Sequence, residues 1–174
     1  MNTIRLDKQT ISEITDRLLS ARKSNLKMVL DIAHRLESVE VIEGAEWLDD
    51  SKATSVEATR YSMSCIEEPI IWLLPSAALP EGGDALRDIV NERVKAIFFV
   101  EEGDGSVIEE FVDCVGFVQS CADMDDMVKE ALTHSEAGDV ILFSPAMRSN
   151  PEFEDYRERG RAFQSSLRAT QINQ

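Results

Sequence analysis

The sequence predicts a layered α/β domain in which helices flank a mostly parallel sheet. Three short runs are almost wholly apolar: 69–74 (Pro-Ile-Ile-Trp-Leu-Leu), 96–100 (Ala-Ile-Phe-Phe-Val) and 140–143 (Val-Ile-Leu-Phe). Such runs are typical of strands that are buried on both faces of a sheet. Helical patterns separate them, and alternation of strands with helices favours parallel pairing through crossover connections.

The remaining elements follow from local periodicity. Amphipathic spacing predicts helices over residues 8–21 and from Ser24, which form an N-terminal helical segment, residues 1–33. Alternation on either side of Glu43-Gly44 predicts a β-hairpin over 36–48. Further helices are expected at 56–65, 84–94, 106–112 and 124–132, with a weaker strand at 115–118. The cap and proline of Asn150-Pro151-Glu152 predict the start of a last helix.

Composition bounds the class of protein. The chain has 174 residues, 43% hydrophobic and 29% charged, and we expect one domain over residues 34–174. It has no run of eighteen apolar residues and no apolar leader, so we expect no membrane partner and a cytoplasmic location. The net charge of −15 repels phosphate backbones and argues against a nucleic-acid partner. The three cysteines lack metal-ligand spacing and are expected to be free, buried thiols.

The stretch from Trp47 to Thr59 reads as the end of a strand, a hydroxyl-rich turn and the start of a helix. Backbone N–H groups at a helix N-terminus lack partners and favour an anion. The turn adds one cation, three hydroxyls and two acids: Lys52, Ser51, Thr54, Ser55, Asp49 and Asp50. The simpler alternative is that Thr54 or Ser55 only caps the helix and Lys52 is a surface charge.

Other nucleotide and phosphate motifs are absent. The sequence contains no Gly-x-x-x-x-Gly-Lys-Ser/Thr loop and no Rossmann glycine fingerprint. A phospho-acceptor receiver domain would explain the acid pair Asp49-Asp50, but receivers usually carry a lysine before a proline after the last strand. This chain has Ser144-Pro145 there, which disfavours that class.

Four segments together resemble the C-terminal domain of the Mur ligases, most closely of the members that add D-glutamate. They are His34-Arg35-Leu36-Glu37, Asp49 to Thr59, Gly138 to Ala146, and Phe153 with Tyr156 leading to Arg159-Gly160-Arg161-Ala162-Phe163. The resemblance implies a Rossmann-like α/β fold. It also implies ATP-dependent ligation of an acid to an amino acid in peptidoglycan synthesis, through an acyl phosphate.

The resemblance also assigns site residues by motif. His34, Arg35 and Asp50 would face the nucleotide, with Asp50 near the ribose. Lys52, Thr54, Ser149 and Tyr156 would hold the amino acid, and no catalytic or metal-ligating residue is carried over. The implied cofactors, ATP and Mg²⁺, would be bound mostly by a central domain that these 174 residues do not contain.

Departures from the family pattern open a second hypothesis. The loop from Pro75 to Gly83 lacks the family's lysine, with Leu79 near its place, and Arg148 is the candidate replacement. Ser55 stands for the usual asparagine. The first hypothesis is that the chain is part of a working ligase, either as an excised domain or together with a separate chain that supplies the missing domains. We expect it to be inactive alone, because acyl phosphate formation depends on the magnesium and triphosphate site of the central domain. The alternative is a diverged pseudoenzyme that serves protein interaction or regulation.

Overall fold

The computed structural model describes residues 33–148 and 152–172, without the side chains of the last two. Its strands form one six-stranded sheet in the order β1-β2-β6-β3-β4-β5. Their bounds are Glu37–Ile42 (β1), Ala45–Asp49 (β2), Ile70–Leu74 (β3), Val94–Val100 (β4), Phe117–Cys121 (β5) and Val140–Phe143 (β6). Only β1 runs antiparallel to its neighbour, so the predicted mostly parallel sheet is confirmed. The helices predicted within residues 1–32 lie outside the described residues.

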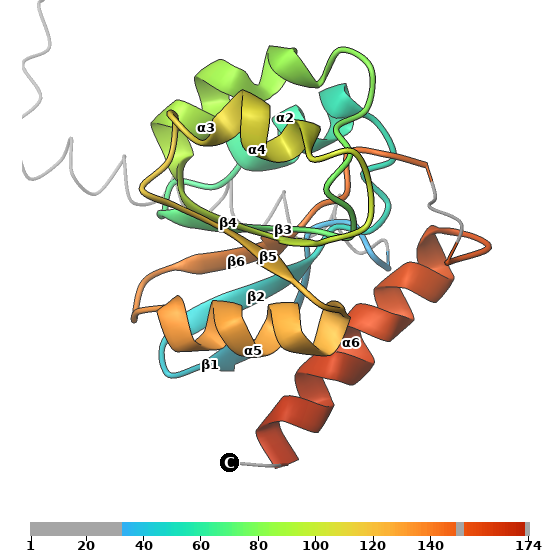
Figure 1. Cartoon of the computed structure of the whole chain (residues 1–174). Coiled ribbons are helices and arrows are strands. Elements are labelled where there is room, and N and C mark those ends of the chain that lie inside the picture. Colours follow the sequence, from blue (N-terminus) through green and yellow to red (C-terminus); the bar gives the residue numbers. More distant parts are fainter. Residues whose placement is uncertain (1–32, 149–151, 173–174) are drawn as a thin grey trace, which may run out of the picture. The chain divides into compact units, whose positions relative to one another are not determined.

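Helices cover both faces of the sheet (Figure 1). On one face lie α2 (Val56–Ser64), the 3₁₀ turn η1 (Gly83–Leu86), α3 (Arg87–Arg93) and α4 (Ser106–Phe111). On the other lie α5 (Met124–His134) and α6 (Tyr156–Ile172). No helix among the described residues is long and apolar enough to cross a membrane.

Each face of the sheet has its own apolar core. Every residue of β3 and β6 is buried, and successive side chains alternate between the two cores. Trp72 meets Phe111 of α4 with ring centroids 5.6 Å apart, whereas Phe143 stacks on Phe163 of α6 at 4.6 Å. The central strands are therefore covered on both sides, as their all-apolar sequences predict.

The predicted hairpin is β1–β2. Its two-residue turn, Glu43-Gly44, has φ values of 51° and 86°, and left-handed residues at both positions match the twist of the flanking strands. Glycine is also required sterically, because a Cβ on Gly44 would lie 2.8 Å from the Cβ of Ala137.

Two predicted boundaries were wrong. The fifth strand begins at Phe117 rather than Val115, because Cys114 and Val115 pack against the core before the chain joins the sheet. The last helix begins at Tyr156 rather than near Pro151, because Asp155 accepts from the N–H groups of Arg157 and Glu158. The cysteines are free as expected, but only Cys121 is fully buried, and burial raises the pKa of its thiol to about 12.

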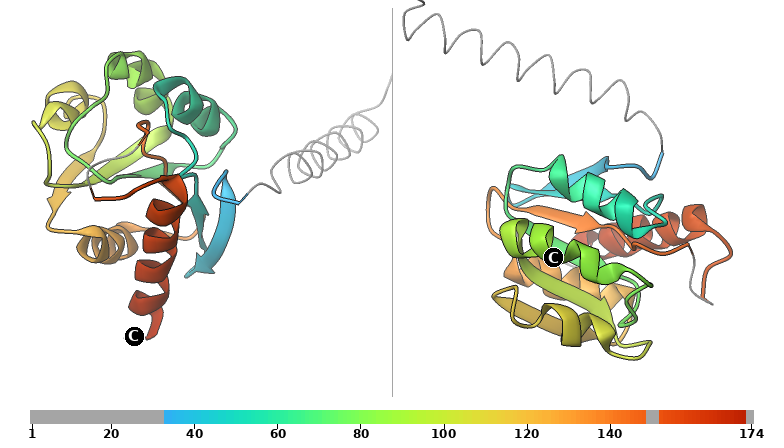
Figure 2. Two further views of the ribbon diagram at one scale, coloured as in Figure 1. Left: turned by 90° about the vertical axis from the view of Figure 1, so that its right-hand side faces the viewer. Right: turned by 90° about the horizontal axis from the view of Figure 1, so that it is seen from above.

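The fold has a topological switch point between β2 and β6. These strands are parallel neighbours, but the chain leaves β2 for α2 on one face and leaves β6 for α6 on the other. Figure 2 shows α6 lying beside the β1–β2 hairpin while α2 lies on the opposite side of the sheet. Ligands of open α/β sheets bind at the carboxyl ends of strands where the connections diverge in this way.

Candidate functional site

The turn after β2 lies at this switch point and is fixed by three backbone hydrogen bonds. Asp50 N–H donates to Phe143 O of β6 at 2.9 Å, and Ala53 N–H closes the turn on Asp50 O at 2.8 Å. Lys52 N–H donates to His34 O at 2.9 Å. The turn is thereby joined to β6 and to the segment that enters β1.

The helix that follows is capped by Ser55. Its φ of −148° is extended, and its hydroxyl accepts from Ala58 N–H at 3.3 Å. The expectation that Thr54 or Ser55 caps this helix is therefore confirmed for Ser55. Thr54 lies half-buried between the cap and Lys52, so its hydroxyl belongs to the same turn.

Lys52, Tyr156 and His34 come together although 122 positions separate the first and the last of them in sequence. The ammonium of Lys52 lies 5.8 Å from the centroid of the Tyr156 ring, within range of a cation–π contact. The same ring lies edge-on to His34, with centroids 6.2 Å apart. One aromatic ring at the start of α6 thus borders both the cation of the turn and the imidazole.

Arg35 and Asp50 form a second pair. Arg35 Nη1 lies 3.5 Å from Asp50 Oδ1, and 19% of the Arg35 side chain is exposed. Asp50 itself is fully buried, and its other oxygen accepts from Ser144 Oγ at 2.7 Å. Burial raises the pKa of Asp50 to about 6, against hydrogen bonds from Ser62 and Ser144 and the charge of Arg35. In this conformation Asp50 holds Arg35 and the loop after β6 and offers no surface to a ribose.

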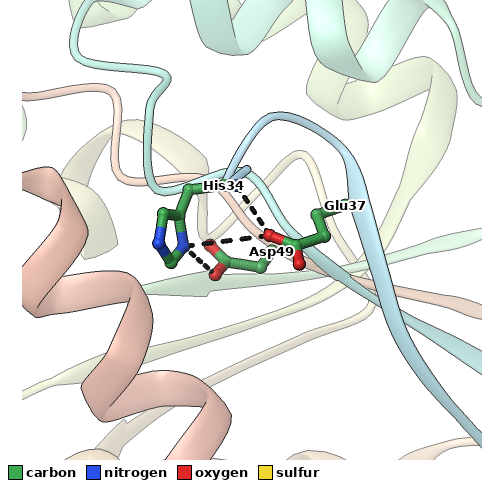
Figure 3. Close-up of side chains that lie close together, drawn as sticks. All are labelled: His34, Glu37 and Asp49. Atoms are coloured by element: carbon green, nitrogen blue, oxygen red, sulfur yellow. Dashed lines mark hydrogen bonds and ion pairs between the residues drawn. The ribbon is translucent and has the colours of Figure 1, made fainter. Parts of the chain in front are cut away.

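The imidazole of His34 is held by a buried carboxylate (Figure 3). Its Nδ1 lies 2.7 Å from Asp49 Oδ2 and 4.0 Å from Glu37 Oε2. Gln164 Nε2 donates to the same Asp49 oxygen at 2.8 Å. One ligand atom from each of His34, Glu37 and Asp49 lies within 4.8 Å of the others, so a divalent cation could bind there if Nδ1 lost its proton.

Arg159 is a structural residue of the site that the sequence did not single out. It is fully buried, and its Nη2 donates to Ser51 O at 2.9 Å and to Met147 O at 3.0 Å. One guanidinium therefore joins α6 to the loops after β2 and β6. Burial lowers its pKa to about 10, and the negative charge of Asp49 acts in the opposite direction. Its only signal in the sequence was the Arg-Gly-Arg-Ala-Phe segment of the resemblance.

Left-handed backbone conformations gather at the site. Four non-glycine residues in the described part have positive φ, and three of them lie here: His34 at 65°, Leu36 at 43° and Ala146 at 59°. Such residues are uncommon and persist where surrounding contacts fix them. Here the contacts are the hydrogen bonds from His34 N–H to Glu37 and from Leu36 N–H to Asp50.

The structure brings most of the predicted site residues to one edge of the sheet. His34, Lys52 and Tyr156 form one group, Arg35 and Asp50 form another, and Thr54 lies on the turn that joins them. Ser149 lies outside the described residues. Arg148 is exposed.

The loop after β3 is directed elsewhere. Ala77 N–H donates to Glu102 O at 2.7 Å and Leu79 N–H donates to Ser106 Oγ at 2.7 Å, so the loop is tied to the β4–α4 connection. The side chain of Leu79 packs against the core. Near the place where the resemblance implies a lysine, this chain therefore has a partly buried apolar side chain.

A separate groove lies away from these cations, between α5, α6 and the tip of the hairpin. It encloses about 820 Å³, and four of its lining residues are acidic: Glu43, Asp123, Asp125 and Asp126. The four acids outnumber the one cation that lines the groove, Lys129, so the groove disfavours a carboxylate or phosphate ligand. Lys52 and Arg35 lie at the switch point instead.

Known proteins resemble the chain over most of its length. No protein-family model matches the chain. It is 32% identical over 161 residues, 90% of its length, to a UDP-N-acetylmuramoylalanine–D-glutamate ligase from Christiangramia forsetii, and 32% identical over 160 residues to the enzyme of that name from Leuconostoc citreum. The chain spans 36% and 35% of the lengths of these two relatives.

Solved structures show the same fold. A domain assigned to a UDP-N-acetylmuramate:L-alanyl-gamma-D-glutamyl-meso-diaminopimelate ligase from Haemophilus ducreyi superposes with a TM-score of 0.51, at 15% identity over 76% of this chain and 99% of that one. A murein peptide ligase from Psychrobacter arcticus gives 0.53, at 15% identity over 78% of this chain and 30% of that one. Sequence and fold together identify the chain as a domain of the Mur ligase family, matching the C-terminal domain of its members.

Proposed function

We propose that this domain supplies one side of the ligand site of a D-glutamate-adding Mur ligase. In this proposal Arg35 and Lys52 bind the phosphates of the nucleotide and the carboxylates of the incoming amino acid. The observation that carries it is the position of Lys52, held beside His34 and Tyr156 at the carboxyl edge of β2 and β6. Cations and hydroxyls at this edge suit a dicarboxylate or a phosphate.

The cofactors belong to this proposal. The family resemblance implies ATP, which when bound supplies the phosphoryl group that activates a carboxylate. Arg35 fits a phosphate, since it is partly exposed and held in place by Asp50. We assign Mg²⁺ to domains beyond these 174 residues, because Asp49 and Asp50 have no exposed surface and Nδ1 of His34, which a cation would need as a ligand, is hydrogen-bonded to Asp49. The proposal includes a partner for this domain, on the same or on a separate polypeptide, and a cytoplasmic site of action.

A second candidate function is protein interaction by a diverged, non-catalytic domain. It is favoured by the loop after β3, which contains no cation and packs the partly buried Leu79 against the core. In that case the scaffold would persist while amino-acid binding is lost.

Ligand titration distinguishes the two. D-glutamate, and separately ADP with Mg²⁺, are titrated into the purified chain, into Lys52→Ala and into Lys129→Ala, which removes an exposed lysine on α5 as a matched control. We expect millimolar binding that weakens at least about fivefold in Lys52→Ala, the loss of a charge-assisted contact worth about 1 kcal/mol. Lys129→Ala should bind as the wild type does. Absence of any response, or an equal response in all three proteins, contradicts the ligase proposal and favours the interaction candidate.

A further inference from the structure

The carboxylate of Asp49 is saturated by donors. It is fully buried, and Oδ1 accepts from Ser51 N–H at 2.9 Å and from Ser51 Oγ at 2.5 Å. Oδ2 lies 2.8 Å from Gln164 Nε2 and 2.7 Å from His34 Nδ1. Carboxylate oxygens can only accept hydrogen bonds, so Nδ1 of His34 must carry the hydrogen in this contact.

This contact determines the chemistry of the other ring nitrogen. A neutral imidazole with hydrogen on Nδ1 has a lone pair on Nε2. Figure 3 shows that nitrogen directed away from both carboxylates. The contacts of the His34 ring with hydrogen-bonding groups all involve Nδ1, so Nε2 has no partner among the residues described in the structure, and 12% of the side chain is exposed.

Neighbouring groups place this lone pair in the amino-acid part of the site. The resemblance placed His34 at the nucleotide, but in the structure it lies beside Tyr156 and its carbonyl accepts from Lys52 N–H. The resemblance assigns both of these neighbours to the amino acid. Arg35, assigned to phosphate, is paired separately with Asp50. Glu37 and Asp49 give the imidazole a negative environment, and the guanidinium of Arg159 is the buried positive charge that faces Asp49.

We propose that Asp49 is a positioning residue that keeps His34 in the Nδ1–H tautomer, so that Nε2 accepts a proton from the ammonium group of the incoming amino acid. The inference rests on the proposed function. In this step an N–H bond of the ammonium breaks, the amine keeps the electron pair, and a new Nε2–H bond forms. The resulting imidazolium is stabilised by the Asp49 carboxylate. The free amine is the form that can attack an acyl group.

The tautomer is measured directly by long-range ¹H–¹⁵N NMR at about pH 8, where a free imidazole is neutral. The chain has two histidines, so His134, whose Nδ1 lies 2.8 Å from Glu130 O, is an internal control. We expect hydrogen on Nδ1 of His34 in the wild type. In Asp49→Asn the amide oxygen must still accept from Ser51, which turns the NH₂ group toward His34 and shifts the hydrogen to Nε2. Hydrogen on Nε2 in the wild type, or an unchanged tautomer in Asp49→Asn, overturns the inference.

Ligand-binding measurements distinguish the positioning role of Asp49 from a purely structural role. Glutarate carries both carboxylates of glutamate but no amine. We expect Asp49→Asn to weaken D-glutamate binding at least about fivefold and to leave glutarate binding unchanged, because only the amine donates to Nε2. Equal losses for both ligands contradict the proton-acceptor role. If the wild type binds neither ligand, the proposed function fails, while the tautomer measurement still decides the role of Asp49.

Discussion

The backbone of α6 passes close to the His34–Asp49 pair at Gly160. A Cβ at this position would lie 2.8 Å from Asp49 Oδ2 and would overlap the His34 ring. Neither neighbour can give way easily, since both are held by hydrogen bonds. The imidazole of His34 can therefore occupy this position only because residue 160 has no side chain.

Gly160→Ala should destabilise the domain even though alanine favours helices. Helix propensity gains up to about 1 kcal/mol, whereas overpacking in a rigid interior costs about 1–3 kcal/mol. We expect a lower free energy of unfolding in urea and a shifted ring resonance of His34. Ser165→Ala, at an exposed position of the same helix, is the control and should be neutral or slightly stabilising. A stabilised Gly160→Ala protein would show that α6 lies further from His34 than described.

Asp50 makes the stability of the fold depend on pH. Its pKa rises from 3.8 to about 6 on folding, so between these values the folded state holds a proton that the unfolded state has lost. Stability contributed by this group is therefore present below about pH 4 and is lost as the pH rises through about 6.

Asp50→Asn removes that dependence. The free energy of unfolding of the wild type, taken relative to Asp50→Asn, should fall by about 2 kcal/mol between about pH 4 and pH 7. Urea unfolding of both proteins across this range measures the difference, in which the other titrating groups cancel. If this difference in the free energy of unfolding stayed constant or rose with pH, burial would not raise the pKa of Asp50.

At the scale of elements, Arg159 joins the parts of the site. The two carbonyls that it binds belong to the loops after β2 and β6, whereas Arg159 itself belongs to α6. Its Nε and Nη1 are buried without a partner among the described residues. Arg159 therefore makes two charge-assisted hydrogen bonds, while two of its buried nitrogen atoms have lost water without gaining a partner among the described residues.

We expect Arg159→Met to cost about 2–4 kcal/mol, because Ser51 O and Met147 O would be left buried without a donor. Arg157→Met changes a residue on the same helix whose side chain is 59% exposed and should change stability by no more than about 0.5 kcal/mol. Urea denaturation of both variants tests the comparison. Equal stability of Arg159→Met and the wild type would mean that removing the unpaired N–H groups offsets the lost hydrogen bonds.

The central strands could be predicted from sequence because burial on both faces of the sheet requires a run of apolar residues. The three apolar runs predicted the bounds of β3, β4 and β6 to within two residues, and Glu43-Gly44 predicted the hairpin turn. The edge strand β5 was misplaced because Phe117 is 38% exposed, so no apolar run marks the strand. The start of α6 was misplaced because Asp155, rather than Asn150, binds the first free N–H groups among the described residues.

At the scale of the whole molecule, the hydroxyl-rich turn between β2 and α2 was predictable, but the hydrogen bonds that orient it were not. The turn around Lys52 was found because its composition is unusual next to a strand and a helix. The bonds that orient it join residues far apart in sequence, such as Arg159 with Ser51 and Gln164 with Asp49. They depend on how closely α6 approaches the hairpin, which no local pattern encodes. For the same reason the burial of Asp50 was not foreseen.

The proposed function requires that the cations and hydroxyls at the carboxyl ends of β2 and β6 form one side of a ligand site. A ¹H–¹⁵N chemical-shift map of the chain, recorded with D-glutamate and ADP with Mg²⁺ together, tests this directly. We expect the shifted amides to cluster in segments 34–36, 50–55 and 144–148. Shifts confined to the acidic groove around Glu43, Asp123 and Lys129, or no shifts at millimolar ligand, would contradict it.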